Sequence, residues 1–118
     1  KPKSLAGLSI RSEICRTQGN WEQVVHDCKR MLSIPGDHRP AILCRRAEAR
    51  LQMRQYPGAV QDATAAMEAD DTMAQAYAYR GEAFYQMQQY KRATADFDMY
   101  RRLERLASGA RYEAPMRI

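Results

Sequence analysis

Residues 77–98, YAYRGEAFYQMQQYKRATADFD, show the clearest structural pattern of this 118-residue chain. Apolar side chains recur in this stretch at intervals of three and four residues, which is the period of an amphipathic helix. A short polar run interrupts the pattern and predicts a tight turn between two helices. Gly81 stands inside the first helix, where glycine is unfavourable by roughly 0.5–1 kcal/mol relative to alanine. It therefore predicts a point where the two helices approach closely.

The same pattern occurs three times along the chain. The sequence RGEA at residues 80–83 is preceded by RAEA at 46–49 and by RSEI at 11–14, so the spacings are 34 and 35 residues. Each is followed by a polar break, an aromatic residue and a second apolar run. Such a recurrence is typical of stacked helix-turn-helix repeats.

These repeats define the expected domain organisation. A chain of this length is enough for one compact domain and too short for two. A single helical hairpin cannot bury its apolar face alone, so the repeats are expected to stack into an all-α solenoid whose first helices line the concave side. The expected segments are a flank at 1–4, repeats at about 5–38, 39–72 and 73–107, and a C-terminal tail at 108–118.

Residue size predicts the packing within each repeat. Small residues are expected where the two helices cross, and large residues beside them fill the remaining space. The small positions are Ser12, Ala47 and Gly81 on the first helices and Val24, Ala59 and Ala93 on the second helices. The aromatic residues expected in the core of the third repeat are Tyr77, Phe84, Tyr90 and Phe97.

The third repeat closely resembles the tetratricopeptide repeat, a 34-residue unit with the pattern W-x2-L-G-x2-Y, then A-x3-F, then P. The positions that carry the resemblance are Tyr77, Arg80, Gly81, Phe84, Ala93 and Phe97. With the two earlier repeats it extends over about residues 5–105. The resemblance implies a right-handed superhelical solenoid that acts as a non-enzymatic scaffold for protein–protein interaction.

Many proteins of this family resemble co-chaperones, which hold the terminal carboxylate of a chaperone tail with a clamp of lysines, asparagines and an arginine. In this chain the five clamp positions are Ser9, Glu13, Arg45, Gln75 and Tyr79. Only Arg45 is cationic, and Glu13 would repel a carboxylate. We therefore expect the domain to lack the carboxylate clamp.

The concave face is the expected partner-binding site. Glu13, Glu48 and Glu82 occupy equivalent positions, so stacking would align them in a row. One interpretation is a polar groove with tyrosine anchors for a basic or amphipathic peptide or helix. The other is that each glutamate pairs with an arginine of a neighbouring repeat and only braces the solenoid. The residues expected in the groove are Glu13, Arg16, Arg45, Glu48, Gln52, Gln75, Tyr79, Glu82, Tyr85 and Gln86.

The middle repeat separates its charges between its two helices. Residues 39–54 carry +4, from five arginines and Glu48, while Asp62, Glu68, Asp70 and Asp71 give residues 61–71 a charge of −4. This pattern indicates attraction between antiparallel helices, or alternatively an arginine-lined patch for an acidic partner.

The last helix is expected to extend through YRRLERLAS, with Tyr100, Leu103 and Leu106 at helical spacing. The extension has three interpretations: it covers the last repeat, it contacts a second copy in a homodimer, or it continues into a longer protein. The functional alternatives to the scaffold are accordingly a chaperone co-factor with a variant groove and a self-association module.

Other function classes find no support in the sequence. The net charge of +5 lies in the tails, because Lys1 and Lys3 supply +2 and residues 101–118 supply +3, so no nucleic-acid partner is expected. No apolar run reaches the roughly 18 residues of a membrane span, so no membrane partner is expected.

No enzyme, metal site or cofactor is expected either. The chain has no Gly-rich phosphate loop, no HExxH and no GxSxG motif. Cys15, Cys28 and Cys44 are odd in number and lack CxxC spacing, which indicates buried thiols in a reducing compartment. The expected location is the cytoplasm.

Overall fold

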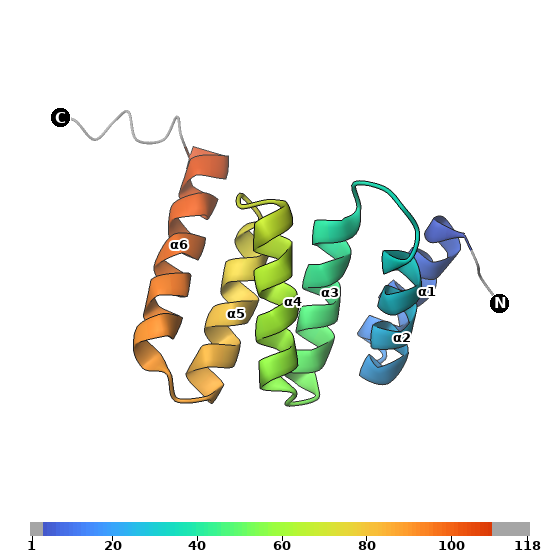
Figure 1. Cartoon of the computed structure of the whole chain (residues 1–118), viewed down its shortest axis with the longest axis horizontal. Coiled ribbons are helices and arrows are strands. Elements are labelled where there is room, and N and C mark those ends of the chain that lie inside the picture. Colours follow the sequence, from blue (N-terminus) through green and yellow to red (C-terminus); the bar gives the residue numbers. More distant parts are fainter. Residues whose placement is uncertain (1–3, 110–118) are drawn as a thin grey trace.

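The computed structural model describes residues 4–109, and this part of the chain contains six helices and no strand. The helices stand side by side in a row (Figure 1), and consecutive helices form antiparallel hairpins. In chain order they are α1 (Leu5–Thr17), α2 (Trp21–Leu32), α3 (Arg39–Gln52), α4 (Tyr56–Ala69), α5 (Ala74–Gln86) and α6 (Tyr90–Gly109). The predicted all-α repeat solenoid is confirmed. The flank at 1–3 and the tail from 110 to 118 lie outside the described residues.

The three hairpin turns share one backbone conformation. Gly19, Arg54 and Gln88 occupy equivalent positions and have positive φ angles of 75°, 63° and 64°. The next residue in each turn donates its amide hydrogen to a carbonyl five residues back, as in Asn20 to Cys15 at 2.9 Å. This arrangement caps the C-terminal end of each first helix. Only the first repeat places a glycine there.

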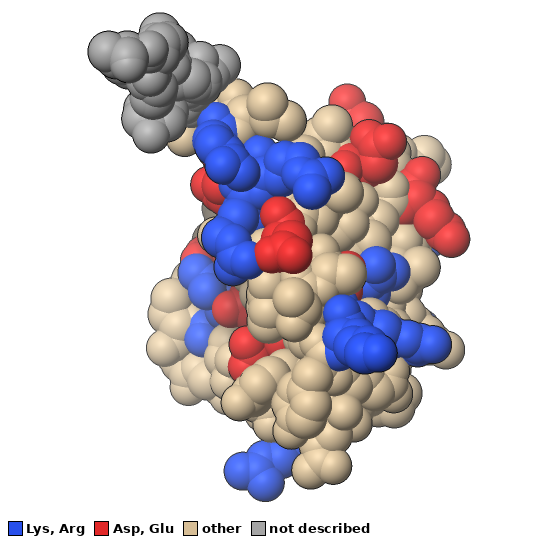
Figure 2. All heavy atoms as spheres, turned by 90° about the vertical axis from the view of Figure 1, so that its left-hand side faces the viewer, with Lys and Arg blue, Asp and Glu red and all other residues tan. Residues whose placement is uncertain are grey.

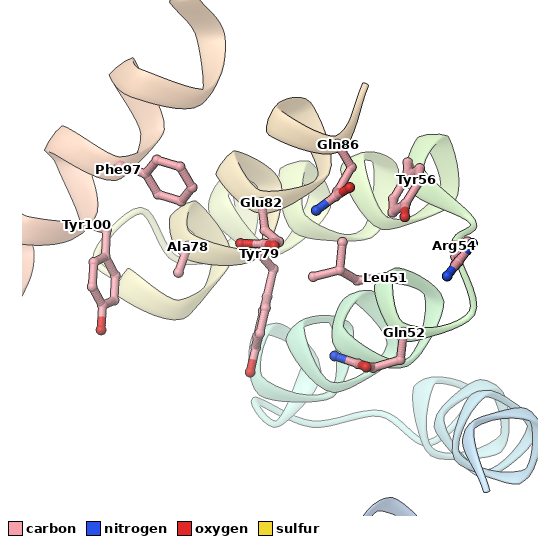
Figure 3. Close-up of a pocket in the computed structure, with 10 residues that line it drawn as sticks. All are labelled: Leu51, Gln52, Arg54, Tyr56, Ala78, Tyr79, Glu82, Gln86, Phe97 and Tyr100. Atoms are coloured by element: carbon pink, nitrogen blue, oxygen red, sulfur yellow. The ribbon is translucent and has the colours of Figure 1, made fainter. Parts of the chain in front are cut away.

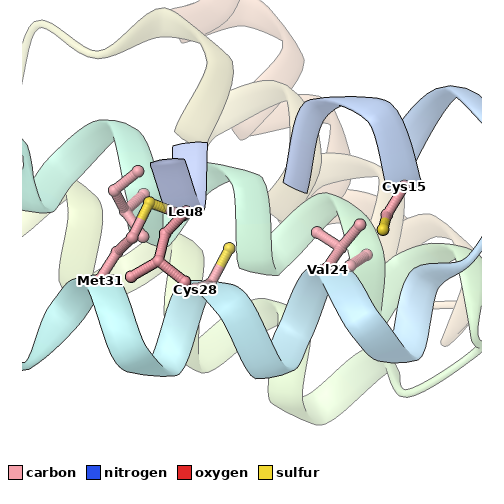
Figure 4. Packing of buried hydrophobic residues seen from close by; sticks show 7 residues of the cluster. Leu8, Cys15, Val24, Cys28 and Met31 are labelled. Carbon is pink, nitrogen blue, oxygen red and sulfur yellow. The ribbon is translucent and has the colours of Figure 1, made fainter. Parts of the chain in front are cut away.

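Each of the two core clusters joins neighbouring repeats. Leu8 of α1 meets Cys28 and Met31 of α2 (Figure 4), and the next repeat adds Ile42 and Ala49 of α3 to the same cluster. A second cluster joins the middle and third repeats, and its buried members are Leu43, Cys44, Ala47, Ala63, Ala66, Met67 and Ala76. Helices α3 and α5 therefore pack against the hairpin before them.

The predicted small positions are all buried. A Cβ atom built on Gly81 would lie 2.8 Å from Cε1 of Phe97, so the helices of the third repeat cross as closely as the sequence predicts. Among the predicted core aromatics, Phe84 is buried, whereas Tyr77 and Phe97 are half-buried. Tyr90 was predicted to be in the core, and this is wrong, since it begins α6 at the end of the array and is 54% exposed.

Every repeat contains one buried aspartate paired with an arginine. The pairs join residues 16 apart on the two helices of one hairpin: Arg11–Asp27, Arg46–Asp62 and Arg80–Asp96. In each pair the arginine donates from Nε and Nη2 to both carboxylate oxygens, at 2.9 and 2.8 Å in the middle repeat. Arg50 also lies 3.1 Å from Asp62. Asp62 of α4 thus attracts two arginines of α3, as predicted for the helices of the middle repeat. Its side chain is buried, whereas the sequence analysis placed it in a solvated segment.

Helix α6 continues past the end of α5 to Gly109. Leu103 is half-buried, and Leu106 is 64% exposed. The face shown in Figure 2 gathers cationic side chains next to the end of the described chain. The exposed charged residues of these last turns are Arg101, Arg102, Glu104 and Arg105. None of the helices between residues 4 and 109 has the length and apolar character required to cross a membrane.

Candidate partner-binding groove

The first helices line a surface with two depressions that meet at Tyr79. The N-terminal depression has a volume of about 320 Å³ and is lined by residues of α1, α3 and α5. The C-terminal depression has a volume of about 810 Å³ (Figure 3) and is lined by residues of α3, α4, α5 and α6. Tyr79 is half-buried and belongs to both.

The structure brings together all the predicted groove residues except Tyr85. Those in the N-terminal depression are Glu13, Arg16, Arg45, Glu48, Gln75 and Tyr79. Those in the C-terminal depression are Gln52, Tyr79, Glu82 and Gln86. Tyr85 lines neither depression, because it lies about 100° round the helix from Gln86. It is 53% exposed and packs edge to face on Tyr90, with 5.4 Å between the ring centroids.

The most informative groove residues that the sequence analysis missed are on α6. Phe97 and Tyr100 line the C-terminal depression beside Ala78 of α5. Tyr79 and Tyr100 extend from neighbouring helices in roughly the same direction (Figure 3). The sequence offers one sign of these groove residues: the side chain at the Phe97 position is larger in the third repeat than in the first two, which have Cys28 and Ala63 there. The other missed lining residues are Leu51, Arg54 and Tyr56 here, and Ala41, Cys44 and Met73 in the N-terminal depression.

Two of the three aligned glutamates are held by arginines. Arg16 donates to Glu13 at 2.8 Å and to Glu48 of the next repeat at 3.4 Å. Arg45 lies 3.8 Å from Glu13 and donates to the hydroxyl of Ser12 at 2.7 Å. The hydrogen bond from Arg16 lowers the pKa of Glu13. Glu13 and Glu48 thus form the bracing contacts that were one of the two predicted alternatives.

Glu82 differs from the other two glutamates. It is exposed, and within residues 4–109 no Lys, Arg or His nitrogen lies within 4.0 Å of its carboxylate. The C-terminal depression therefore combines a carboxylate that no described cation pairs with and half-buried aromatic and aliphatic surface.

Tyr79 is neutral at physiological pH. Burial raises its pKa to about 12, and the nearby Glu48 carboxylate acts in the same direction. Its hydroxyl therefore keeps its proton and can donate a hydrogen bond to a bound segment.

The five positions of the family's clamp lie close together. Glu13, Arg45, Gln75 and Tyr79 line the N-terminal depression, and Ser9 accepts from Arg45 at 3.4 Å. Arg45, the one cation among these five residues, already contacts Glu13 and Ser12. The other described cation of this depression, Arg16, is held by Glu13 and Glu48.

No protein-family model and no curated protein matches the chain. Solved structures do match. The TPR domain of Arabidopsis OM64 has 28% sequence identity and a TM-score of 0.80, with 85% of this chain and 82% of that chain covered. The second TPR domain of human RPAP3, in complex with the HSP70 peptide SGPTIEEVD, has 26% identity and a TM-score of 0.76, with 82% and 80% covered.

A further similar structure is the TPR2B domain of yeast Sti1 in its pHsp70 complex. It has 21% identity and a TM-score of 0.81, with 91% of this chain and 87% of that chain covered, and at this identity it shows the fold alone. Three stacked helical hairpins, the repeated sequence pattern and these structural neighbours show that the chain has the fold of a tetratricopeptide repeat domain.

Proposed function

We propose that this domain is a non-enzymatic scaffold that binds a peptide or helical segment of another protein in the groove formed by the two depressions. The observation that carries the proposal is the C-terminal depression, where Tyr79 and Tyr100 offer aromatic surface beside Glu82, whose carboxylate has no cationic partner among residues 4–109. Half-buried tyrosines are typical anchors of protein interfaces. A free carboxylate next to them favours a segment that carries Lys or Arg together with one or two apolar residues.

The cytoplasm is the compartment that suits this scaffold. Cys15, Cys28 and Cys44 are free and buried, which fits a reducing environment.

A chaperone co-factor is the second candidate, because similar structures contain HSP70 and HSP90 peptides. We infer that acidic chaperone tails bind this domain weakly or not at all. Glu13 places a carboxylate at one clamp position, and Arg45 is engaged by Glu13 and Ser12. A ligand carboxylate would meet repulsion and would have to displace these contacts.

Peptide selection tests the proposal directly. A library of random 12-residue peptides displayed on phage is selected against the domain, and the dissociation constants of the enriched peptides are measured by calorimetry. We expect Lys or Arg with apolar residues among them, and Tyr79→Ala should weaken binding by about 1–2 kcal/mol. Glu82→Gln should mainly slow association and reduce its salt dependence.

Tyr85→Ala is the matched control, since this tyrosine lies outside both depressions. The groove proposal is wrong if Tyr79→Ala and Glu82→Gln leave all selected peptides unaffected. The chaperone alternative gains support instead if the HSP70 peptide SGPTIEEVD binds with micromolar affinity and amidation of its C-terminus abolishes that binding.

A further inference from the structure

Two helices of the chain show how a helix packs against the preceding hairpin of this array. Helix α3 packs against α2 and places Ile42 and Ala49, seven residues apart, in the core cluster of the first repeat, which also contains Leu8 and Cys15 of α1. Helix α5 does the same on the middle repeat, where Ala76 occupies the position equivalent to Ile42. Small or aliphatic residues at these positions allow a close approach of the helix to its support.

The equivalent surface of the third repeat is not covered by any described helix. Cys28 and Met31 of α2 are fully buried beneath α3, and Ala63 and Ala66 of α4 are fully buried in the cluster that includes Ala76 of α5. Their counterparts on α6 are Phe97 and Tyr100, which are half-buried and line the C-terminal depression.

One ion pair adds a charge to this register, although α5 carries Tyr79 at the equivalent position. Glu13 of the first repeat lies 3.8 Å from Arg45, which follows Ile42 by three residues on the helix that seats there. Glu82 is the equivalent residue of the third repeat and has no cation within 4.0 Å among the described residues. A helix seated on α5 and α6 in the manner of α3 would place its Arg45 equivalent beside Glu82.

We propose that the C-terminal depression receives one amphipathic helix of a partner protein, which continues the stack beyond α6. This helix carries an aliphatic or small residue at one position, Arg or Lys three residues later, and a small residue seven residues after the first. The inference rests on the proposed function and specifies both the part of the groove that is used and the class of partner.

A second copy of the chain fits this site less well than such a partner. The helix that a second copy would offer is α1, and it has Ile10 at the position of Arg45. Ile10 would bring an aliphatic side chain, rather than a cation, to the carboxylate of Glu82. The charge pattern therefore favours a different protein.

The probe for the test is a synthetic peptide of residues 39–52, RPAILSRRAEARLQ, in which Cys44 is replaced by serine and both ends are blocked. It contains Ile42, Arg45 and Ala49 in the required register. Binding to the isotope-labelled full chain is followed by NMR. We expect shifts at Ala78, Phe97 and Tyr100 and none at Tyr85.

Charge reversal tests the register. The peptide variant Arg45→Glu should bind the domain at least ten-fold more weakly, and Glu82→Arg in the domain should restore its affinity to within about three-fold. The peptide variant Ala47→Pro, which cannot form the helix, should lose binding. Tyr85→Ala in the domain is the control that leaves binding unchanged.

Several results would overturn this inference. One is that millimolar peptide causes no NMR shifts in α5 and α6. Another is that the Ala47→Pro peptide binds as tightly as the unmodified peptide. Shifts centred on α1 and α2 would mean that the peptide competes with the chain's own α3. Failure of the charge reversal, while selected peptides still depend on Tyr79, would remove the helix inference and leave the proposed function standing.

Two other occupants are distinguished by separate measurements. If deletion of residues 110–118 shifts the resonances of Phe97 and Tyr100, the chain fills its own site. If sedimentation shows a dimer that Tyr100→Ala dissociates, the occupant is a second copy. Either result would refute the partner helix.

Discussion

The main polar feature of the core is an arginine–aspartate pair, of which each of the three hairpins contains one. Its carboxylates are 0–6% exposed as side chains, whereas the arginines keep 19–30% exposure. Burial of a carboxylate is unfavourable unless it is paired and hydrogen-bonded, and the guanidinium satisfies both oxygens. The sequence analysis identified the arginines as repeat markers but took Asp62 as part of a charged segment. The signal it missed was the constant spacing of 16 residues in all three repeats.

Asp62 gives the sharpest test of this pair at the level of one residue. Asp62→Ala leaves Arg46 and Arg50 without their shared carboxylate, and we expect the free energy of unfolding to fall by about 2–3 kcal/mol. Urea denaturation measures the loss. The control is Asp98→Ala, which removes an exposed pair with Arg101 and should cost less than about 1 kcal/mol. Equal losses for the two variants would mean that the buried pair contributes no more to the free energy of unfolding than the exposed pair.

Asp27 should make stability depend on pH in acid. Burial alone would raise its pKa, but hydrogen bonds from Arg11 and Gln23 outweigh burial and lower it below the usual 3.8. A carboxylate with a lowered folded-state pKa stabilises the fold fully above pH 3.8, and this contribution is lost as the pH falls through the folded-state pKa. Urea midpoints measured from about pH 5 to pH 2 should fall less steeply for Asp27→Asn than for the unmodified chain. Parallel curves would contradict the assignment.

At the level of the helices, the sequence predicted three hairpins at the observed positions but not the conformation of their turns. Ser4 caps α1 by accepting from Gly7 at 3.0 Å, and Gly19 with Asn20 makes the first turn. The turn conformation at Arg54 and Gln88 was not predictable from residue type, because neither residue favours positive φ. Stacking on neighbouring repeats and the cap hydrogen bonds impose it.

These two turns offer a stabilising substitution. Gln88 has a φ angle of 64°, which is unfavourable for a residue with a side chain, so Gln88→Gly should raise the free energy of unfolding by about 1 kcal/mol. The converse control is Gly19→Ala in the equivalent turn, where an added Cβ meets no atom within 4 Å. That variant should lose a similar amount through backbone strain alone. Thermal unfolding checks both, and an unchanged stability in both variants would mean that the caps tolerate the strain.

At the level of the whole molecule, stacking explains what the sequence revealed of the groove and what it did not. Because equivalent residues of successive first helices line one face, the repeat alignment alone predicts that Glu13, Glu48 and Glu82 lie along that face. Whether a glutamate is paired depends on long side chains from other repeats, and the alignment does not specify their rotamers. Phe97 and Tyr100 became groove residues because no described helix covers α6.

The same stacking predicts how the array opens. Cys28 lies in the core shared by the first and middle repeats, and Cys44 lies in the core shared by the middle and third repeats. Burial raises the pKa of both thiols to about 12, so neither reacts with a thiol reagent near neutral pH until its cover opens. Separation of the terminal hairpin α1–α2 breaks an interface made mainly between α2 and α3 and uncovers Cys28. Separation of the other terminal hairpin, α5–α6, uncovers Cys44, but it must break the contacts of α5 with both α3 and α4. Repeat arrays gain stability from nearest-neighbour interfaces, so the first repeat, which has the smaller interface, should open at a lower free energy than the third repeat. Pulsed thiol labelling followed by mass spectrometry should therefore find Cys28 modified faster than Cys44 in native buffer. The two rates should converge as urea approaches the unfolding midpoint, because global unfolding then dominates exposure. Equal rates at every urea concentration would instead mean that the three repeats unfold as one cooperative unit.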